Sequence, residues 1–243
     1  MKKIAVLQSN YIPWKGYFDI IGMVDEFILY DEVQYTTNDW RNRNRIKTPS
    51  GPVWLTIPVL HNRRFGQRID EARVSDRRWP KKHCQSLLTY YSKAPFFKVL
   101  FPSLEAVYAS CADEERLSAI NRAFLQWVCD ALGMVTRIRS SLDYPSDGDR
   151  NERLVALCKL AGAGAYLSGP AARQYLDVAM FRENSIAVRW MDYSGYPEYP
   201  QLHGPVFRHD VTVLDLLFNV GPEAAWRYIK SPRPDAKRDR VAV

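Results

Sequence analysis

The sequence has no long apolar run and few cysteines. No apolar stretch approaches the roughly 20 residues that span a bilayer. The N-terminus "MKKIAVLQSN" has only a four-residue apolar stretch after its lysines, which is too short for a secretory signal. The four cysteines are widely spaced, without a C-x-x-C motif or a nearby histidine pair, so we expect buried, reduced thiols. These absences together predict a cytoplasmic protein that does not enter a membrane.

Several signatures of common enzyme classes are also missing. The chain has no G-x-G-x-x-G, no G-x-x-x-x-G-K-[ST] and no G-x-S-x-G. Their absence argues, in that order, against a dinucleotide oxidoreductase, a P-loop enzyme and an α/β-hydrolase. No H-x-x-x-H occurs, so a metal centre is not expected. The sequence predicts no particular cofactor.

Positive charge is abundant and is concentrated in one segment. The 243 residues have a net charge of +7, and residues 38–82 alone contain twelve Lys or Arg against four Asp or Glu. A basic segment favours an anionic partner, and nucleic acid, a nucleotide and a phosphorylated sugar all remain open. The end of the chain, residues 231–243, is basic and lacks a hydrophobic pattern, so we expect a disordered tail.

Strands and helices are predicted to alternate along most of the chain. Residues 3–8 are typical of a buried strand, and a short helix (16–24) and a second strand (26–35) follow as one βαβ unit. The alternation resumes after residue 134, with strands at 135–139, 165–169 and 185–191 and helices between and after them. This pattern predicts an open, mostly parallel, doubly wound α/β sheet of the Rossmann-like kind.

Two insertions interrupt the alternation. Strand-like runs at 41–47 and 53–59 flank Pro49-Ser50-Gly51-Pro52 and predict a β-hairpin. Helical patterns at 79–92, 97–110 and 115–131 predict a helical insertion over about residues 79–132. We expect a single α/β domain over residues 1–230 that contains both insertions.

Three loops are expected to hold ligands, because open parallel sheets bind them outside the carboxyl ends of their strands. These loops are "QSNYIPWKGYFD" (8–19), Ser168-Gly169-Pro170, and the aromatic segment 192–210. A helix start is the simpler interpretation of the second loop alone, although Arg173 in its first turn suits an anion. The candidate binding residues from these loops and from the ends of apolar strands are Gln8, Asn10, Tyr11, Trp14, Lys15, Asp31, Ser168, Gly169, Arg173, Asp192 and Gln201.

The segment "RNRNRIK" (41–47) has two interpretations. In a strand, its four cations would share one face, because side chains alternate with a period of two. They would form either a phosphate-binding ladder or a solvated hairpin face. For the first case, the candidate substrate-binding residues are Arg41, Asn42, Arg43 and Arg45.

The histidines are the candidate general bases. His83 lies four residues after Trp79 in a predicted helix, where a packed histidine is the more common outcome, but its surroundings are cationic. His203 and His209 lie in the aromatic segment, and His61 follows the hairpin. We select His83 and His203 as the candidate catalytic residues.

Taken together, these pieces resemble the WbqC-like family, bacterial proteins associated with surface-polysaccharide (O-antigen type) gene clusters. The resemblance rests on "LQSNYIPWKGYFDII", "DEFILYDEVQYTTNDWRNRNRIKT", "WLTIPV", "YLSGPAARQYLD", "YPQLHG" and "TVLDLLFNVG". It implies a cytoplasmic protein that acts on activated sugars or their acyl groups in lipopolysaccharide biosynthesis.

A looser similarity links the chain to nucleotidylyltransferases, which place a P-x-H-x-G-H loop after their first strand. Here the corresponding stretch is Pro13-Trp14-Lys15-Gly16-Tyr17, one residue shorter between Pro and Gly and without either histidine. The similarity therefore implies a nucleotide pocket of related shape, but not adenylyl transfer by the same histidines.

Three functions follow from these observations. The leading hypothesis is a transferase that attaches an acyl or aminoacyl group to a nucleotide-linked amino sugar, with a carrier protein or a charged tRNA as alternative donors. The second is an ATP-using nucleotidyl or ligase-type enzyme. The third is a non-catalytic RNA-binding protein, suggested by Trp40, Trp54 and Phe65 among the cations. The sequence leaves the acceptor sugar and the oligomeric state open.

Overall fold

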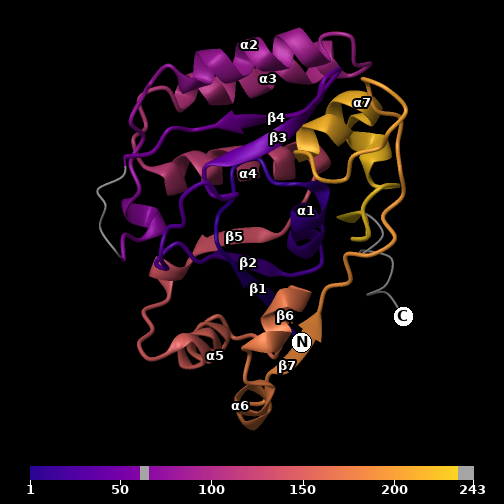
Figure 1. The fold of residues 1–243 in the computed structure, drawn as a ribbon. Coiled ribbons are helices and arrows are strands. Elements are labelled where there is room, and N and C mark those ends of the chain that lie inside the picture. Colours follow the sequence, from indigo (N-terminus) through magenta and orange to yellow (C-terminus); the bar gives the residue numbers. More distant parts are fainter. Residues whose placement is uncertain (61–65, 235–243) are drawn as a thin grey trace.

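A parallel β-sheet forms the centre of the molecule. The computed structural model describes residues 1–60 and 66–234 (Figure 1). Five strands lie in the order β5-β2-β1-β6-β7, and each neighbouring pair is parallel. Their bounds are β1 (Lys3–Leu7), β2 (Glu26–Leu29), β5 (Arg137–Ser140), β6 (Ala165–Ser168) and β7 (Ala187–Trp190). The predicted open parallel sheet is confirmed.

Helices cover both faces of this sheet. Ile4 and Val6 of β1 pack with α5 (Arg150–Leu160) and α6 (Val178–Glu183) in one apolar cluster. Ala5 of the same strand belongs to a second cluster, with α1 (Lys15–Gly22), α4 (Leu117–Leu132) and α7 (Val213–Ala225). Alternate residues of one strand lie on opposite faces of the sheet, so a run of consecutive apolar residues is buried on both faces. The doubly wound arrangement is thus present.

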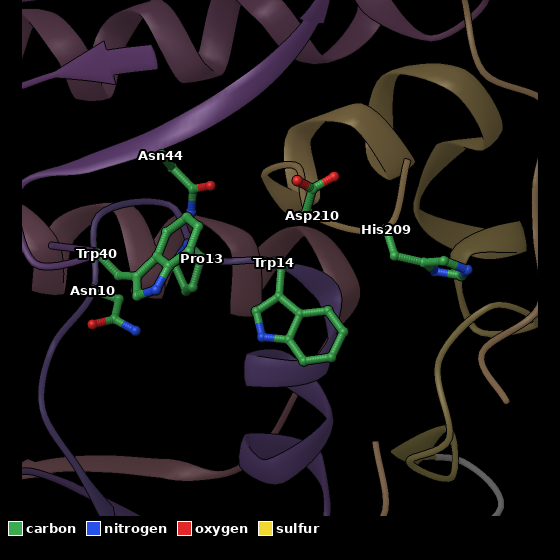
Figure 2. A pocket seen from close by; sticks show the side chains of 7 residues that line it. All are labelled: Asn10, Pro13, Trp14, Trp40, Asn44, His209 and Asp210. Atoms are coloured by element: carbon green, nitrogen blue, oxygen red, sulfur yellow. The ribbon is translucent and has the colours of Figure 1, made fainter. Parts of the chain in front are cut away.

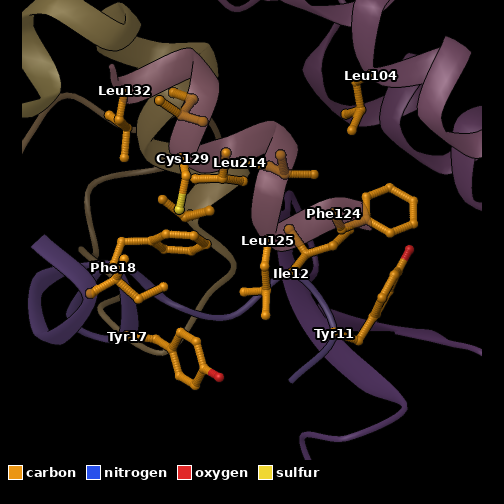
Figure 3. Close-up of a cluster of buried hydrophobic side chains, with 14 of the residues drawn as sticks. Tyr11, Ile12, Tyr17, Phe18, Leu104, Phe124, Leu125, Cys129, Leu132 and Leu214 are labelled. Atoms are coloured by element: carbon orange, nitrogen blue, oxygen red, sulfur yellow. The ribbon is translucent and has the colours of Figure 1, made fainter. Parts of the chain in front are cut away.

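The second cluster continues from the sheet into the two predicted insertions. The hairpin consists of β3 (Arg43–Thr48) and β4 (Gly51–Thr56), and α2 (Trp79–Tyr91) and α3 (Phe97–Ser110) lie beside it (Figure 1). Figure 3 shows Phe124 and Leu125 of α4 near Tyr11 and Ile12, from the loop that follows β1 (residues 8–14), and near Leu104 of α3. The insertions therefore share a core with the sheet, and the single domain over residues 1–230 remains a prediction.

Several element boundaries differ from those predicted. β3 begins at Arg43, so Arg41 precedes the strand. The helix expected after Gly169 is divided into a 3₁₀ helix (Pro170–Gln174) and α6, because the carboxylate of Asp177 accepts hydrogen bonds from the N–H groups of Ala179 and Met180 and starts a new helix. The first of these is too short to have an appreciable dipole. α7 bends at Gly221, whose φ of 78° favours glycine.

The described residues bear on three further expectations, which concern the cysteines, metal binding and membrane spans. All four cysteines are buried and unpaired, as predicted. The residues that the structure describes contain no group of three His, Cys, Asp or Glu able to hold a metal ion. Within residues 1–60 and 66–234, no helix has the length and hydrophobicity needed to cross a membrane. His61, Phe65 and most of the tail (235–243) lie outside the described residues.

Candidate functional site

The opening loop, residues 8–14, follows β1, the strand at which the strand order of the sheet reverses. β2 lies on one side of β1 and β6 on the other, so the connections diverge there. The loop is held by the Ser9 N–H, which donates to Asp31 Oδ1 at 2.8 Å, and by the Asn44 side chain, which donates to the carbonyl of Ile12 at 2.8 Å. Ile12 has a φ of 38°, which is rare for a β-branched residue and requires such support.

The first hollow beside this loop, here called the cationic cleft, has a volume of about 650 Å³ and lies outside β1 and β6. Arg41, Arg150 and Arg153 line it, and no carboxylate is among its described lining residues. Outside this lining, Asp39 lies 3.7 Å from Arg41, and Glu32 lies near Arg153. Three guanidiniums with two carboxylate partners leave a net positive charge, which favours phosphate or another anion. The other lining residues with polar side chains or exposed backbone are Gln8, Asn10, Tyr30, Gln34, Gly148, Tyr166, Ser168, Gly169 and Tyr175.

Arg41 is attached to the opening loop. Its guanidinium donates hydrogen bonds to Asn10 Oδ1 and Gln8 Oε1, and its side chain is only 15% exposed. Its Nε is buried and has no hydrogen-bonding partner among the described residues. Arg41 thus joins the loop to the cleft at a fixed position.

The other two guanidiniums come from the first turns of α5. Asp149 caps this helix by accepting from the N–H groups of Asn151 and Glu152, so the helix starts at a defined residue. Positions three apart share a helix face, which brings Arg150 and Arg153 to the cleft together. Arg153 lies 3.3 Å from Glu32, a partner outside the cleft lining, and Arg150 stacks on Tyr175 with its guanidinium carbon 4.6 Å from the ring centroid.

A second hollow, here called the aromatic hollow, lies on the other side of the opening loop. It has a volume of about 350 Å³. Its lining consists of Asn10, Pro13, Trp14, Trp40, Asn44, His209 and Asp210 (Figure 2). Gly16 is required there, because a Cβ at this position would lie 2.3 Å from the Trp14 indole. Asn10 lines both hollows, and the consecutive residues Trp40 and Arg41 line one each.

His209 is the titratable base of the aromatic hollow. Its ring packs against Phe207 at a centroid distance of 4.5 Å. Partial burial and the charge of Lys15 lower the pKa of His209 below its ordinary value, so the exposed imidazole is neutral at pH 7. A neutral, accessible imidazole is able to accept a proton.

A third hollow, here called the acidic hollow, lies outside β2 and β5 and measures about 360 Å³. Its charged and hydroxyl-bearing lining consists of Asp31, Glu32, Asp70, Arg116, Ser118, Arg122, Ser140, Ser141 and Asp143. Segment 30–34 separates it from the cationic cleft, since Tyr30 and Val33 line the cleft.

The predicted site residues are divided among these places. Gln8, Asn10, Arg41, Ser168 and Gly169 line the cationic cleft. Asn10 and Trp14 line the aromatic hollow, and Asp31 lines the acidic hollow. Of the remaining predicted residues, none lines any of the three. They are Tyr11, Lys15, Asn42, Arg43, Arg45, His83, Arg173, Asp192, Gln201 and His203.

His83 is enclosed in the core instead. Its Nε2–H donates a hydrogen bond to the carbonyl of Thr56 at 3.1 Å, so Nδ1 accepts a hydrogen bond from the Tyr11 hydroxyl at 2.8 Å. Tyr108 completes the row by hydrogen bonding to Tyr11. Burial lowers the pKa of His83 to about 4, and the ring is 5% exposed. The structure therefore gives Tyr11 and His83 a packing role and no opening to a ligand.

The selection of His203 over His209 does not match the geometry of segment 192–210. His203 has a φ of 68°, and its Nε2 lies 2.7 Å from the carbonyl of Tyr90, away from the hollows. The chain turns there at Gly204, and His209 returns to the aromatic hollow. Arg150 and Arg153 were also missed. The capping-box spacing of Asp149 and Glu152 predicts the helix that contains Arg150 and Arg153. The two arginines near the start of that predicted helix were the available signal.

The hairpin cations do not form a common phosphate ladder. Arg41 lies outside the strand, and Lys47 is buried, with its ammonium 3.3 Å from the carbonyl of Gly204. Arg43 donates to the carbonyl of Asn38, and Arg45 pairs with Asp210. The guanidiniums of Arg43 and Arg45 also stack on Trp54, at 4.1 and 4.4 Å from its ring centroid. The buried Asn42 side chain donates to the carbonyl of Ile57 at 2.8 Å.

Segment 192–210 is anchored by polar contacts. Lys15 donates to the carbonyl of Pro197 at 2.9 Å and lies 5.1 Å from the ring centroid of Tyr196, and burial lowers its pKa to about 8. Asp192 accepts hydrogen bonds from Ser194 and lies near Lys230, and these contacts lower its pKa to about 2. Arg173 stacks on Trp190 at 5.0 Å from the ring centroid and lines none of the three hollows.

Gln201 belongs to the strongest of these anchors, which surrounds Asp215. The Asp215 carboxylate is fully buried and accepts from the hydroxyls of Tyr91 and Tyr199 at 2.7 and 2.8 Å and from Gln201 Nε2 at 2.7 Å. Burial raises its pKa, and these donors oppose the rise.

Asp215→Asn is expected to lower the free energy of unfolding by about 2 kcal/mol, because the new amide places a donor against donors in the interior. Urea unfolding at pH 7 measures this. Asp113→Asn is the matched control, since this side chain is 93% exposed, and its midpoint is expected to stay unchanged. Equal midpoints for Asp215→Asn and wild type would contradict the anchoring role.

The comparisons with known proteins agree with the resemblance seen in the sequence. Residues 8–226 match the model of the WbqC-like protein family. The chain belongs to this family. A protein of Mycobacterium tuberculosis named "Uncharacterized protein Rv1507c" is 49% identical over 224 residues, which cover 92% of this chain and 96% of that protein. No solved structure matches the chain. The matched region begins at Gln8 and so includes the opening loop and most of the lining of all three hollows.

Proposed function

We propose that this protein is a cytoplasmic transferase of surface-polysaccharide biosynthesis, which adds an acyl or aminoacyl group to the amine of a nucleotide-linked amino sugar. The observation that carries the proposal is the pair of hollows that meet at Asn10. One offers three guanidiniums for a diphosphate, and the other offers aromatic rings for the sugar. Family membership adds the association with activated sugars that the sequence resemblance implies.

The arrangement supports one reaction geometry. A diphosphate in the cationic cleft interacts with Arg41, Arg150 and Arg153, and the attached sugar passes Asn10 to lie against Trp40 and Trp14. Its amine then lies in the hollow that contains His209. Acyl transfer forms the amide bond at this amine as the bond between the acyl carbon and its donor breaks, and the amine proton goes to His209. The Asn10 amide, which lines both hollows, supplies a donor for the developing oxyanion.

Binding of nucleotide-sugars tests the proposal. The purified protein is expected to gain thermal stability with UDP-, TDP- or GDP-linked sugars, because a ligand that binds only the folded state shifts unfolding. The free sugars serve as controls and are expected to give no shift, since they lack the diphosphate. No shift with any nucleotide-sugar of the panel would overturn the proposal. A shift with ATP and amine-dependent release of pyrophosphate would instead indicate the ligase-type reaction.

Trp40 supplies a test of the aromatic hollow. Its side chain is 39% exposed and forms one wall of that hollow. Trp40→Leu is expected to weaken binding of the nucleotide-sugar that gives the largest thermal shift by about tenfold, which corresponds to about 1.4 kcal/mol of lost contact between the sugar and the indole. Calorimetric titration measures the change. Trp127→Leu is the control, because Trp127 lies on α4 and bonds Ser103 outside the hollows. Equal affinities for the two variants would remove the aromatic hollow from the site.

A further inference from the structure

The acidic hollow at the carboxyl ends of β2 and β5 is not used by the proposed reaction. Four carboxylates and two guanidiniums line it, which gives an excess of negative charge. The carboxylates are Asp31, Glu32, Asp70 and Asp143. Segment 30–34 separates it from the cationic cleft. This segment therefore has guanidiniums on the side of the cleft and carboxylates on the side of the acidic hollow. The acidic hollow thus suits a ligand of opposite charge to the ligand of the cleft.

Asp31 is the most buried carboxylate of this group. It is 7% exposed, and its Oδ1 accepts from the Ser9 N–H at 2.8 Å. Glu32 and Asp70 have cationic partners in Arg153 and Arg68. Among the described residues, no cation lies within ion-pair distance of Asp31. A buried carboxylate without an ion-pair partner is costly, and burial raises the pKa of Asp31, while hydrogen bonds from Ser9 and the charge of Arg41 oppose the rise.

Ser141 provides an independent observation. The residue is 1% exposed and lines the hollow, and its hydroxyl has no hydrogen-bonding partner in the part of the chain that the structure describes. Most buried hydroxyls have a hydrogen-bond partner, so the Ser141 oxygen is a candidate acceptor for a bound group. Asp31 and Ser141 follow the ends of two neighbouring strands, β2 and β5, and both residues line the same hollow.

The chemistry of these groups points to one kind of ligand. A primary ammonium group has three donors and a positive charge, which carboxylate and hydroxyl oxygens satisfy together. The described residues offer no set of three ligands for a metal ion. We propose that the acidic hollow binds the ammonium group of a small primary amine, with Asp31 as its counter-charge and Ser141 Oγ as a hydrogen-bond acceptor. Its volume of about 360 Å³ accommodates an amino acid or a monosaccharide.

This inference goes beyond the proposed function, which needs only the two hollows that meet at Asn10. A free amino acid and an amino sugar share the ammonium group, so the experiment must separate these two sources. Glycine, L-alanine and glucosamine are titrated against the full chain by calorimetry, each beside its N-acetylated counterpart. Acetylation removes the charge and keeps the rest of the skeleton.

At least one amine is expected to bind in the millimolar range, with its N-acetylated counterpart at least about tenfold weaker, as expected for loss of a charged hydrogen bond. Binding of glycine or alanine alone identifies an amino acid as the ligand, and binding of glucosamine alone identifies an amino sugar. Equal binding of amines and N-acetylated compounds, or no saturable binding of any amine, would overturn the inference.

Three variants locate the site. Asp31→Asn keeps an oxygen for the Ser9 N–H and is expected to weaken amine binding at least about tenfold. Ser141→Ala removes a hydroxyl without a protein partner, so it is expected to fold normally and to weaken binding several-fold. Asp113→Asn lies outside the hollow and is expected to change nothing. Unchanged amine affinity in Ser141→Ala together with Asp31→Asn would contradict the assignment. Nucleotide-sugar binding, measured on the same samples, reports separately on the proposed function.

Discussion

The double variant Arg150→Gln/Arg153→Gln is expected to lose at least about a hundredfold in affinity for the nucleotide-sugar that stabilises the wild-type protein best. Each charged hydrogen bond to a phosphate contributes about 1.5–3 kcal/mol, and two are removed together. Both residues lie on α5, whereas it is Arg41 that holds the opening loop by donating to Asn10. The loss therefore reports on the cleft itself. Calorimetric titration at fixed ionic strength measures it.

The matched control is Arg77→Gln/Arg78→Gln, which removes the same charge from two exposed side chains paired with surface carboxylates. Its affinity is expected to stay within about twofold of wild type, since exposed charges more than a Debye length of about 10 Å away are largely screened. If the two double variants lose affinity equally, the effect comes from net charge, and the cleft is not the binding site.

The second large effect is an acid loss of stability caused by His83. Burial lowers its pKa to about 4 in the folded protein, whereas the unfolded chain has a value near 6.5. Between these values the unfolded state binds more protons, so stability is complete above pH 6.5 and falls as the pH falls to 4. The difference corresponds to about 3 kcal/mol in the free energy of unfolding, from 1.36 kcal/mol per unit.

Urea unfolding from pH 7 to pH 4 measures this dependence in the wild type and in His83→Gln, which cannot titrate there. Burial raises the pKa of Asp31 and of Asp215, and these groups oppose the histidine in both proteins. The difference between the two proteins therefore isolates His83. It is expected to be largest at pH 7 and to shrink as the pH falls to 4. Parallel pH profiles would show that His83 is not buried as a neutral ring.

The sheet could be predicted from the sequence because each strand and helix has a hydrophobic pattern within a short stretch of the chain. Apolar runs such as "IAVL" in β1 and "AYLS" in β6 alternate with amphipathic helices, and each pattern lies within a few residues. The hairpin around Pro49 to Pro52 and the three helices between Trp79 and Leu132 were found for the same reason. The position of the opening loop at the sheet edge then follows from the general rule for parallel sheets.

The assignment of side chains to the site depends on contacts between distant segments, and the sequence could not supply these. Tyr11, His83 and Tyr108 meet in one hydrogen-bonded row although up to 97 positions separate them. This row encloses a histidine that the sequence placed in a cationic region. The turn at His203 and Gly204 likewise decides which histidine of segment 192–210 faces the aromatic hollow. Such choices are made by tertiary packing, which leaves no periodic signal.

A crystal structure of the protein with a bound nucleotide-sugar would show directly whether the cationic cleft and the aromatic hollow form one binding site. The ligand is the UDP-, TDP- or GDP-linked sugar with the largest thermal shift. Its diphosphate is expected within hydrogen-bond distance of Arg41, Arg150 or Arg153, outside β1 and β6. Its sugar is expected beside Asn10 and Trp40. A diphosphate bound elsewhere, for example on Arg43 and Arg45 of the hairpin, would contradict the account.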